Sequence, residues 1–121
     1  MAYALVMTPE VRAWLHDLRK RDRASAIQVG QAIGMLLEAG PELGRPLADR
    51  VHHSRLTNLK ELRPGSAGRS EIRILYIFDR RRKAVLLVAG DKAGNWEAWY
   101  RQAIPLAEQR YEDYLKQEDI Q

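Results

Sequence analysis

The sequence predicts an α+β domain in which two N-terminal helices and one C-terminal helix pack on a small, mainly antiparallel sheet. Helical apolar spacing occupies the first third of the chain, strand-like apolar runs follow in the middle, and a second helical stretch comes last. With 121 residues, 45% of them apolar, the chain has material for one ordinary core, and residues 1–121 are expected to form a single domain. We expect the helices to cover one sheet face and leave the other for a ligand.

Two antiparallel helices are predicted at the N-terminal end. Thr8 fits the N-cap of the first and Pro9 its first helical position. Asp22 or Ser25 caps the second, which ends at Gly40-Pro41. Each helix has one apolar face, made of Val11, Trp14, Leu15 and Leu18 in the first and of Ala26, Val29, Ile33, Leu36 and Leu37 in the second.

The segments that follow predict a hairpin after an irregular stretch. Gly44–Arg55 shows no periodicity and contains a proline, so it is expected to be a loop. Leu59–Arg63 and Ser70–Asp79 are predicted to pair through a turn at Pro64-Gly65-Ser66-Ala67-Gly68, although leucines recur at every third position around the first of these strands. Tyr3–Met7 is either a short strand or an apolar contact that precedes the first helix.

The second strand of the hairpin alternates clearly. One set of its side chains faces one way (Ile72, Ile74, Tyr76 and Phe78) and the other set faces the opposite way (Glu71, Arg73, Leu75 and Ile77). After a basic turn at residues 80–83, Ala84–Ala89 is apolar throughout and predicts a central strand buried on both faces. Asn95–Gln117 is helical in pattern and is expected to break or kink at Pro105.

Composition excludes several classes of protein. The chain has no cysteine, so disulfides, thiolate metal sites and thiol nucleophiles are excluded. No apolar run is long enough to cross a bilayer, and Met1–Met7 lacks the charged start of a secretory signal, so we expect a cytoplasmic protein without a membrane partner. Metal-ligand spacing is missing, and the adjacent pair His52-His53 is interpreted as part of a solvated loop. No phosphate-cradling glycine loop or G-x-S-x-G motif is present, and no cofactor is expected.

Positive charge is concentrated in the middle of the sequence. The net charge is +4, but Arg45–Lys83 holds eleven Lys/Arg against four acids. Such a surplus suits a phosphate-binding surface, because neutralised phosphates release counterions. A well-solvated face with many arginines explains the same pattern, and the sequence does not separate the two interpretations.

Three residues of this part of the chain are candidates for chemistry. Arg73 lies within an otherwise apolar strand, where a guanidinium is costly unless it is paired or faces a functional surface. Its alternative role is a salt bridge to Glu61 or Glu71. Lys92 follows the central strand, and it is either functional or an exposed turn lysine. Tyr100 lies beside two tryptophans, where it either packs in the core, stacks on a base or exchanges a proton.

Several short segments of the sequence, taken in order, resemble those of a known group of proteins. They are Leu59-Lys60-Glu61-Leu62-Arg63, Glu71-Ile72-Arg73-Ile74-Leu75-Tyr76, Val85-Leu86-Leu87-Val88-Ala89-Gly90-Asp91-Lys92, Trp96 with Trp99-Tyr100, and Ile104-Pro105-Leu106-Ala107. Over Tyr3 to Leu115 the chain resembles the RelE/ParE superfamily of type II toxin-antitoxin toxins, and in particular its phage-derived HigB-like branch.

The resemblance implies a RelE-like, microbial-ribonuclease-type fold with an open basic sheet face. It also implies a toxin that cleaves messenger RNA in the ribosomal A site as a metal-independent endoribonuclease (an mRNA interferase). In such a reaction the 2′-OH attacks the neighbouring phosphate and leaves a 2′,3′-cyclic phosphate or a 3′-phosphate. The implied partners are messenger RNA on the ribosome and a cognate helix-turn-helix antitoxin, through which alone the toxin meets operator DNA.

Site residues follow from the resemblance one by one. Arg73 matches the strand arginine of the family, and Tyr100 matches the aromatic residue after the last strand. Arg63 falls in the basic strand of the family. Arg73, Arg63 and Tyr100 together form the expected catalytic set. The expected RNA-binding set is Lys60, Lys92 and Arg69. Glu61 departs from the family pattern, because relatives are more uniformly cationic there; it is expected either to pair with Arg73 and orient it or to weaken RNA binding.

Two other functions remain open at this point. ParE-like members of the superfamily inhibit DNA gyrase without cleaving RNA. The chain is alternatively a non-catalytic module whose basic face only holds an acidic antitoxin.

Overall fold

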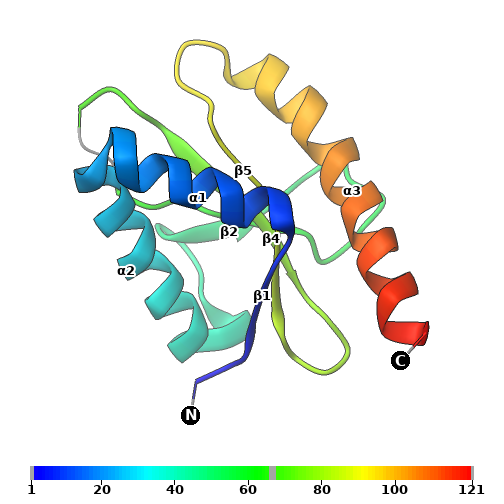
Figure 1. Cartoon of the computed structure of the whole chain (residues 1–121). Coiled ribbons are helices and arrows are strands. Elements are labelled where there is room, and N and C mark those ends of the chain that lie inside the picture. Colours follow the sequence, from blue (N-terminus) through cyan, green and yellow to red (C-terminus); the bar gives the residue numbers. More distant parts are fainter. Residues whose placement is uncertain (1, 66–67, 121) are drawn as a thin grey trace.

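The computed structural model describes residues 2–65 and 68–120 and shows one five-stranded sheet with three α-helices (Figure 1). The strands are β1 (Leu5–Met7), β2 (Ala48–Arg50), β3 (Lys60–Leu62), β4 (Ile72–Phe78) and β5 (Ala84–Asp91), in the spatial order β1-β5-β4-β3-β2. The helices are α1 (Pro9–Arg21), α2 (Arg23–Ala39) and α3 (Trp96–Ile120), with a short 3₁₀ turn, η1 (Gly40–Glu42). Among the described residues, β1 pairs in parallel with β5, and the other three strand pairings are antiparallel. The predicted α+β class is therefore confirmed.

The N-terminal helices begin and end where the sequence predicts. The Thr8 hydroxyl accepts from the Val11 amide at 3.2 Å, and Pro9 opens α1. Of the two caps considered for α2, Asp22 takes the role, accepting from the Ser25 amide at 3.2 Å. α2 ends at Ala39, and Gly40 follows with a φ of 71°. A side chain at Gly40 would collide with the Tyr3 ring, so glycine is needed there for packing as well as for conformation.

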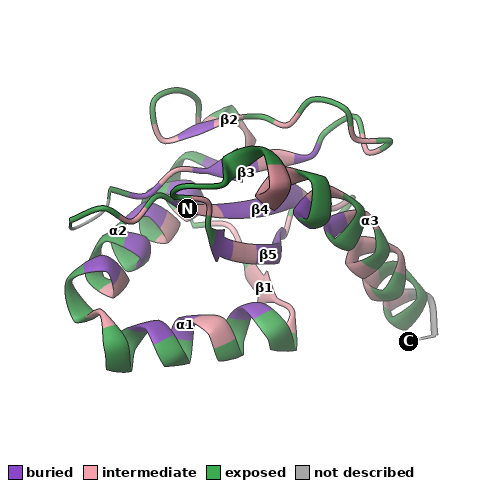
Figure 2. Ribbon diagram, turned by 90° about the horizontal axis from the view of Figure 1, so that it is seen from above, coloured by how far each residue is buried: buried purple, intermediate pink, exposed green. Residues whose placement is uncertain are grey.

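The two faces of the sheet are covered by different helices (Figure 2). α1 and α2 pack on one face, against Ile72, Ile74 and Tyr76 of β4, whereas Ala103 and Ala107 of α3 pack on the opposite face, against Leu75 and Ile77. The expectation that all helices share one face is therefore wrong for α3. Because β5 is buried on both faces and β4 is apolar on both, each face needs its own cover.

The short strands are where the structure adds most to the prediction. Gly44–Arg55, expected to be a loop, contains β2, whose Asp49 pairs with Glu61 of β3. Three residues are too few to show a period, and backbone pairing with β3 makes them a strand. The predicted first strand of the hairpin shortens to Lys60–Leu62, and Tyr3–Met7 contributes β1. Ser66 and Ala67 of the predicted turn lie outside the described residues.

α3 runs without a break from Trp96 to Ile120, so of the break or kink expected at Pro105 the break does not occur. A proline inside a helix removes one backbone hydrogen bond. Ala103 and Ala107, on either side of it, are buried against the sheet and hold both halves of the helix in place. None of the helices in the described part of the chain has the length and apolarity needed to cross a bilayer.

Candidate functional site

A pocket of about 450 Å³ opens where α3 begins, beside the edge of the sheet. Its wall is formed by β2, the loop that follows it, β3 and the first turns of α3. The polar lining residues include Glu61, Arg63, Lys92, Tyr100, His52 and His53. Three segments distant in sequence therefore meet at one cavity.

Glu61 links the three residues of the predicted catalytic set. The residue is only 4% exposed and lines the pocket. One oxygen, Oε2, accepts from Arg63 Nε at 3.0 Å and from its Nη2 at 2.8 Å. The other, Oε1, accepts a short hydrogen bond from the Tyr100 hydroxyl and lies 4.0 Å from Arg73 Nε. Glu61 therefore pairs with Arg73, which is one of the two roles expected for this acidic residue in the basic strand. It also forms hydrogen bonds with Arg63 and Tyr100.

Arg63 and Arg73 lie at adjoining positions on the same sheet face. Leu62 of β3 pairs with Ile74 of β4, so the next residues along the two antiparallel strands are these arginines. The hydrogen bond with Glu61 raises the pKa of Arg63 against the opposing effect of burial, so this guanidinium stays charged. Asp49 of β2 also contacts Arg63, at 3.4 Å.

Arg73 is the more enclosed of the two arginines. Its side chain is 17% exposed, against 35% for Arg63, and it is not part of the pocket lining. Its Nη1 donates to the Ile72 carbonyl at 2.8 Å, while its buried Nε has no hydrogen-bond partner among the residues that the structure describes. An unpaired buried donor is costly, and a bound anion nearby would reduce this cost.

Tyr100 is held as a hydrogen-bond donor. Burial raises the pKa of its phenol, as does the bond to Glu61, and the Arg73 guanidinium lowers it less than these effects raise it. The hydroxyl is therefore protonated at neutral pH and cannot act as a base there. The ring meets Trp96 and Trp99 edge-on, with centroids 6.5 Å and 5.1 Å away.

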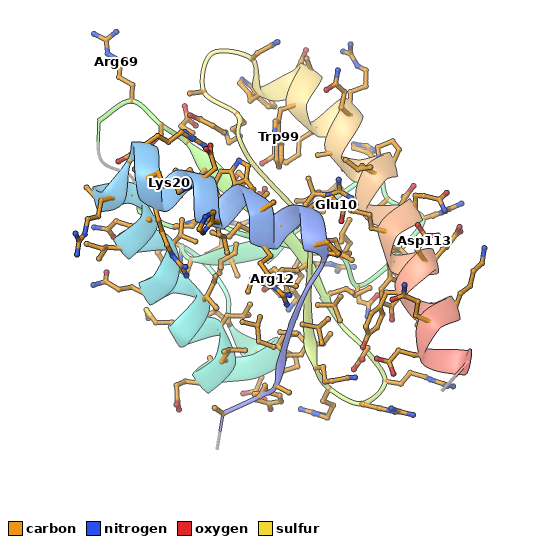
Figure 3. The ribbon with its side chains drawn as sticks, in the orientation of Figure 1. Glu10, Arg12, Lys20, Arg69, Trp99 and Asp113 are labelled. Carbon is orange, nitrogen blue, oxygen red and sulfur yellow. The ribbon has the colours of Figure 1, made fainter. Side chains whose placement is uncertain are left out.

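Trp99 fixes the start of α3 against the sheet (Figure 3). A Cβ at Gly90 of β5 would lie 2.4 Å from Trp99 Nε1, so only glycine allows the indole to rest on this strand. This close approach positions the next residue, Tyr100, over Glu61.

The predicted RNA-binding set divides into three locations. Lys92 lines the pocket, where it pairs with Glu71 at 3.0 Å. Lys60 belongs to the opposite sheet face, because neighbouring strand residues alternate, and its Nζ donates to the Pro41 carbonyl at 2.7 Å. Arg69 is exposed on the loop before β4 and extends away from the body of the molecule (Figure 3). The structure thus brings Lys92, but not Lys60 or Arg69, to the predicted catalytic set.

The pocket is less basic than the sequence indicates. Arg50, Arg63 and Lys92 line it, but so do Asp49, Glu61 and Glu97, an equal number of acids. Much of the central positive charge lies elsewhere, since residues 80–83 form the turn at the far end of β4 from Arg73. The expected open basic face is therefore corrected to a largely covered face with a charge-balanced pocket at its edge.

Two histidines at this pocket are missed by the sequence interpretation. His52 and His53 are exposed, as a solvated loop predicts, yet they line the same cavity as Arg63 and Tyr100. Glu108 of α3 holds the loop, because it accepts from the Ser54 hydroxyl at 2.7 Å and from the Arg55 amide at 2.8 Å. Adjacent histidines argued against a metal site, but no local pattern indicates that this loop docks on α3.

Comparison with known proteins assigns the chain to a family. Residues 13–112 match the family model described as Phage derived protein Gp49-like. The chain is 49% identical over 115 residues to "Putative toxin HigB3" of Mycobacterium tuberculosis (strain ATCC 25618 / H37Rv), which covers 95% of this chain and 96% of that protein. It is 50% identical over 107 residues, 88% of this chain, to "Putative toxin HigB2" of the same organism, but spans only about half (52%) of that protein.

A solved structure shares the fold. It is that of a mutant of the E. coli toxin RelE in the free state, which superposes with a TM-score of 0.59 over 87% of this chain and 97% of that one. The two sequences are 17% identical, so this likeness concerns the fold, and it confirms the predicted RelE-like architecture. The chain therefore belongs to the family of phage-derived Gp49-like proteins and is related to the HigB toxins.

Proposed function

We propose that this chain is the toxin of a type II toxin-antitoxin pair and that it cleaves messenger RNA on the ribosome without a metal ion. Two relatives at about 50% identity carry the word toxin in their names, which supports the first part. The observation that carries the second part is the arrangement of Arg63, Arg73 and Tyr100 around one buried carboxylate beside a pocket. The toxin acts in the cytoplasm, and a cognate helix-turn-helix antitoxin neutralises it and links it to operator DNA.

In the proposed reaction the two arginines stabilise the scissile phosphate. Arg63 meets the phosphate from the pocket, where a third of its side chain is exposed. Arg73 adds a second positive charge from behind it, and at this depth the lower effective dielectric strengthens its attraction to charge that develops on the phosphate oxygens. Glu61 positions both guanidiniums. Lys92 contacts a neighbouring phosphate, while Lys60 and Arg69 lie away from the pocket and have no role at the scissile phosphate.

The chemical step needs a proton acceptor and a proton donor. The 2′-oxygen forms a bond to phosphorus, the bond from phosphorus to the 5′-oxygen breaks, and a 2′,3′-cyclic phosphate and a free 5′-hydroxyl result. The 2′-OH loses one proton and the leaving 5′-oxygen gains one, so no oxidant or cofactor is consumed. Tyr100 is protonated at neutral pH, and turning its one O–H from Glu61 toward the RNA would let it donate to an oxygen that becomes negative. We assign the acceptor to the pair His52 and His53, because histidine is the side chain that commonly exchanges protons near neutral pH.

Removing both imidazoles is expected to slow the chemical step. A His52→Gln/His53→Gln double variant should lower the single-turnover rate on programmed ribosomes by roughly 100- to 10,000-fold, the usual contribution of a general acid or base. Both residues are exposed, so the fold should persist and the thermal midpoint should stay close to that of the wild type. The two single variants identify which imidazole matters, and an undiminished rate in the double variant rules out the assignment.

The proposed activity is tested by inducing the wild-type chain in a bacterial host and mapping new messenger-RNA ends. We expect cuts inside translated frames, carrying 2′,3′-cyclic or 3′-phosphate ends, that disappear when translation is blocked. Growth arrest with intact messages and early loss of DNA synthesis would instead indicate a ParE-like inhibitor of gyrase.

One observation favours a second candidate, a module that binds its antitoxin without catalysis. Three of the cations at the site already have an acid beside them: Glu61 for Arg63 and Arg73, and Glu71 for Lys92. A phosphate must then compete with carboxylates for these cations, at a cost in RNA affinity. Absence of both growth arrest and message cleavage, together with tight binding to the antitoxin, would establish this candidate.

A further inference from the structure

Trp96 is an exposed aromatic side chain that the core does not use. It is the first residue of α3, and 57% of its surface is accessible, the highest value among the large apolar side chains exposed in the described part of the chain. Its neighbour Trp99 lies instead between α3 and β5, on Gly90. Exposing an indole forfeits the stabilisation that burial would give. The position of Trp96 therefore calls for an explanation other than packing.

The indole is held at the rim of the pocket. Lys92 Nζ lies 5.6 Å from the centre of its ring, and the Tyr100 ring meets it edge-on at 6.5 Å and 79°. Trp96 lines the pocket together with Tyr100, Arg63 and the two histidines. Because the Lys92 and Tyr100 contacts limit its motion, a planar ligand that stacks on it loses little additional side-chain entropy.

The chemistry around the ring selects one class of ligand. An exposed aromatic ring beside Lys92, in the same pocket as Arg63, matches a ligand that is planar at one end and anionic at the other, as a nucleotide of single-stranded RNA is. Tyr100 is a poorer platform, because it is half-buried and its hydroxyl is engaged by Glu61. An apolar peptide from a protein partner would use the ring but not the adjacent cations.

We propose that Trp96 is the stacking platform for an unpaired base next to the scissile phosphate. The inference rests on the proposed RNA cleavage and adds to it a binding subsite and its ligand. Trp96 binds the base equally before and during the reaction, while the catalytic set carries out the chemistry. Stacking is tolerant of base identity, so this subsite supplies affinity and register more than sequence preference.

The test removes the ring and the base separately. Ribosomes are programmed with a defined message in which each nucleotide of the A-site codon is made abasic in turn, and cleavage is measured for the wild type and for Trp96→Leu. For the wild type, one abasic position should raise the toxin concentration needed for half-maximal cleavage by roughly 5- to 150-fold, the range observed when base-aromatic stacking is lost. For Trp96→Leu, the same abasic position should raise this half-maximal concentration by no more than about twofold, since the stacking partner is already absent.

Controls separate stacking from folding and from other tryptophans. Trp96→Phe retains an aromatic face and should keep most of the affinity. Trp14→Leu changes a tryptophan of α1, which packs on the opposite sheet face, and should show the full abasic effect. Melting curves establish that each variant is folded. The maximal rate at saturating toxin should change little in Trp96→Leu, because an interaction made equally before and during the reaction affects KM and not kcat.

The outcomes are distinguishable. An equal abasic effect in the wild type and Trp96→Leu overturns the assignment while leaving RNA cleavage intact. Loss of antitoxin binding by Trp96→Leu with unchanged cleavage kinetics also overturns it, because the ring then serves a protein partner. A wild-type chain that cleaves no programmed message contradicts the proposed function itself, and the base subsite with it.

Discussion

Arg73→Ala is expected to abolish growth inhibition while leaving the fold intact. Arg73 supplies positive charge at a position that is 17% exposed, where electrostatic stabilisation of a phosphate oxygen is stronger than in open solvent. Loss of one such group lowers kcat by roughly 100- to 1,000-fold in well-characterised sites. Counting of viable cells after induction, together with the single-turnover rate on programmed ribosomes, measures the effect.

Two companion variants give the Arg73 result its meaning. Arg69→Ala removes an arginine four residues away that extends from the molecule, and it should leave toxicity close to that of the wild type. Arg73→Lys keeps the charge without the planar fork and should recover part of the rate. Toxicity that survives in folded Arg73→Ala would remove this residue from the mechanism, and an unfolded Arg73→Ala would leave Arg73→Lys as the decisive variant.

Glu61→Ala is expected to destabilise the protein more than other losses of a single carboxylate at the site. The substitution leaves the Arg63 and Arg73 guanidiniums and the Tyr100 hydroxyl without their shared acceptor. Removing one member of a buried ionic group costs about 3–5 kcal/mol, and the partial exposure of Arg63 together with its contact to Asp49 reduces this to about 2–3 kcal/mol. The free energy of unfolding from urea titration tests the value.

Glu71→Ala is the matched control for this substitution. Glu71 also pairs with one cation of the pocket, Lys92, but its side chain is 52% exposed, so its loss should cost no more than about 1 kcal/mol. Glu61→Gln keeps an acceptor oxygen, so its free energy of unfolding should lie between those of Glu61→Ala and Glu71→Ala. Equal unfolding free energies for Glu61→Ala and Glu71→Ala would contradict the role of Glu61 as the hub of the site.

The parts of the fold that sequence predicts well are those with a local signal. The cap at Thr8 and the stop at Gly40-Pro41 depend on a few adjacent residues, and the structure confirms both. The alternation in β4 is also confirmed, with Ile72, Ile74 and Tyr76 on one face and Leu75 and Ile77 on the other. β2 is missed because a three-residue strand carries no readable period.

The candidate site is only partly predictable, because its members come from different elements. The resemblance selects Arg63, Arg73 and Tyr100, and the structure brings these three together at Glu61. Alternation along the predicted strand already separates Lys60 from Arg63, and in the structure Lys60 contacts the carbonyl of Pro41 on the other side of the sheet. The register between β3 and β4 decides which of the two shares a face with Arg73, and a shift by one residue would reverse it.

By itself the sequence determined the helix ends, the buried central strand and the resemblance to a family of toxins, because each depends on neighbouring residues or on their order along the chain. Only the tertiary structure decided which element covers each apolar face. α3 crosses the face opposite α1 and α2, and this places Tyr100 on Glu61, 39 residues away, with His52 and His53 across the same pocket. Periodicity reports that a residue is buried, but not against what, because contacts between distant segments depend on how whole faces pack.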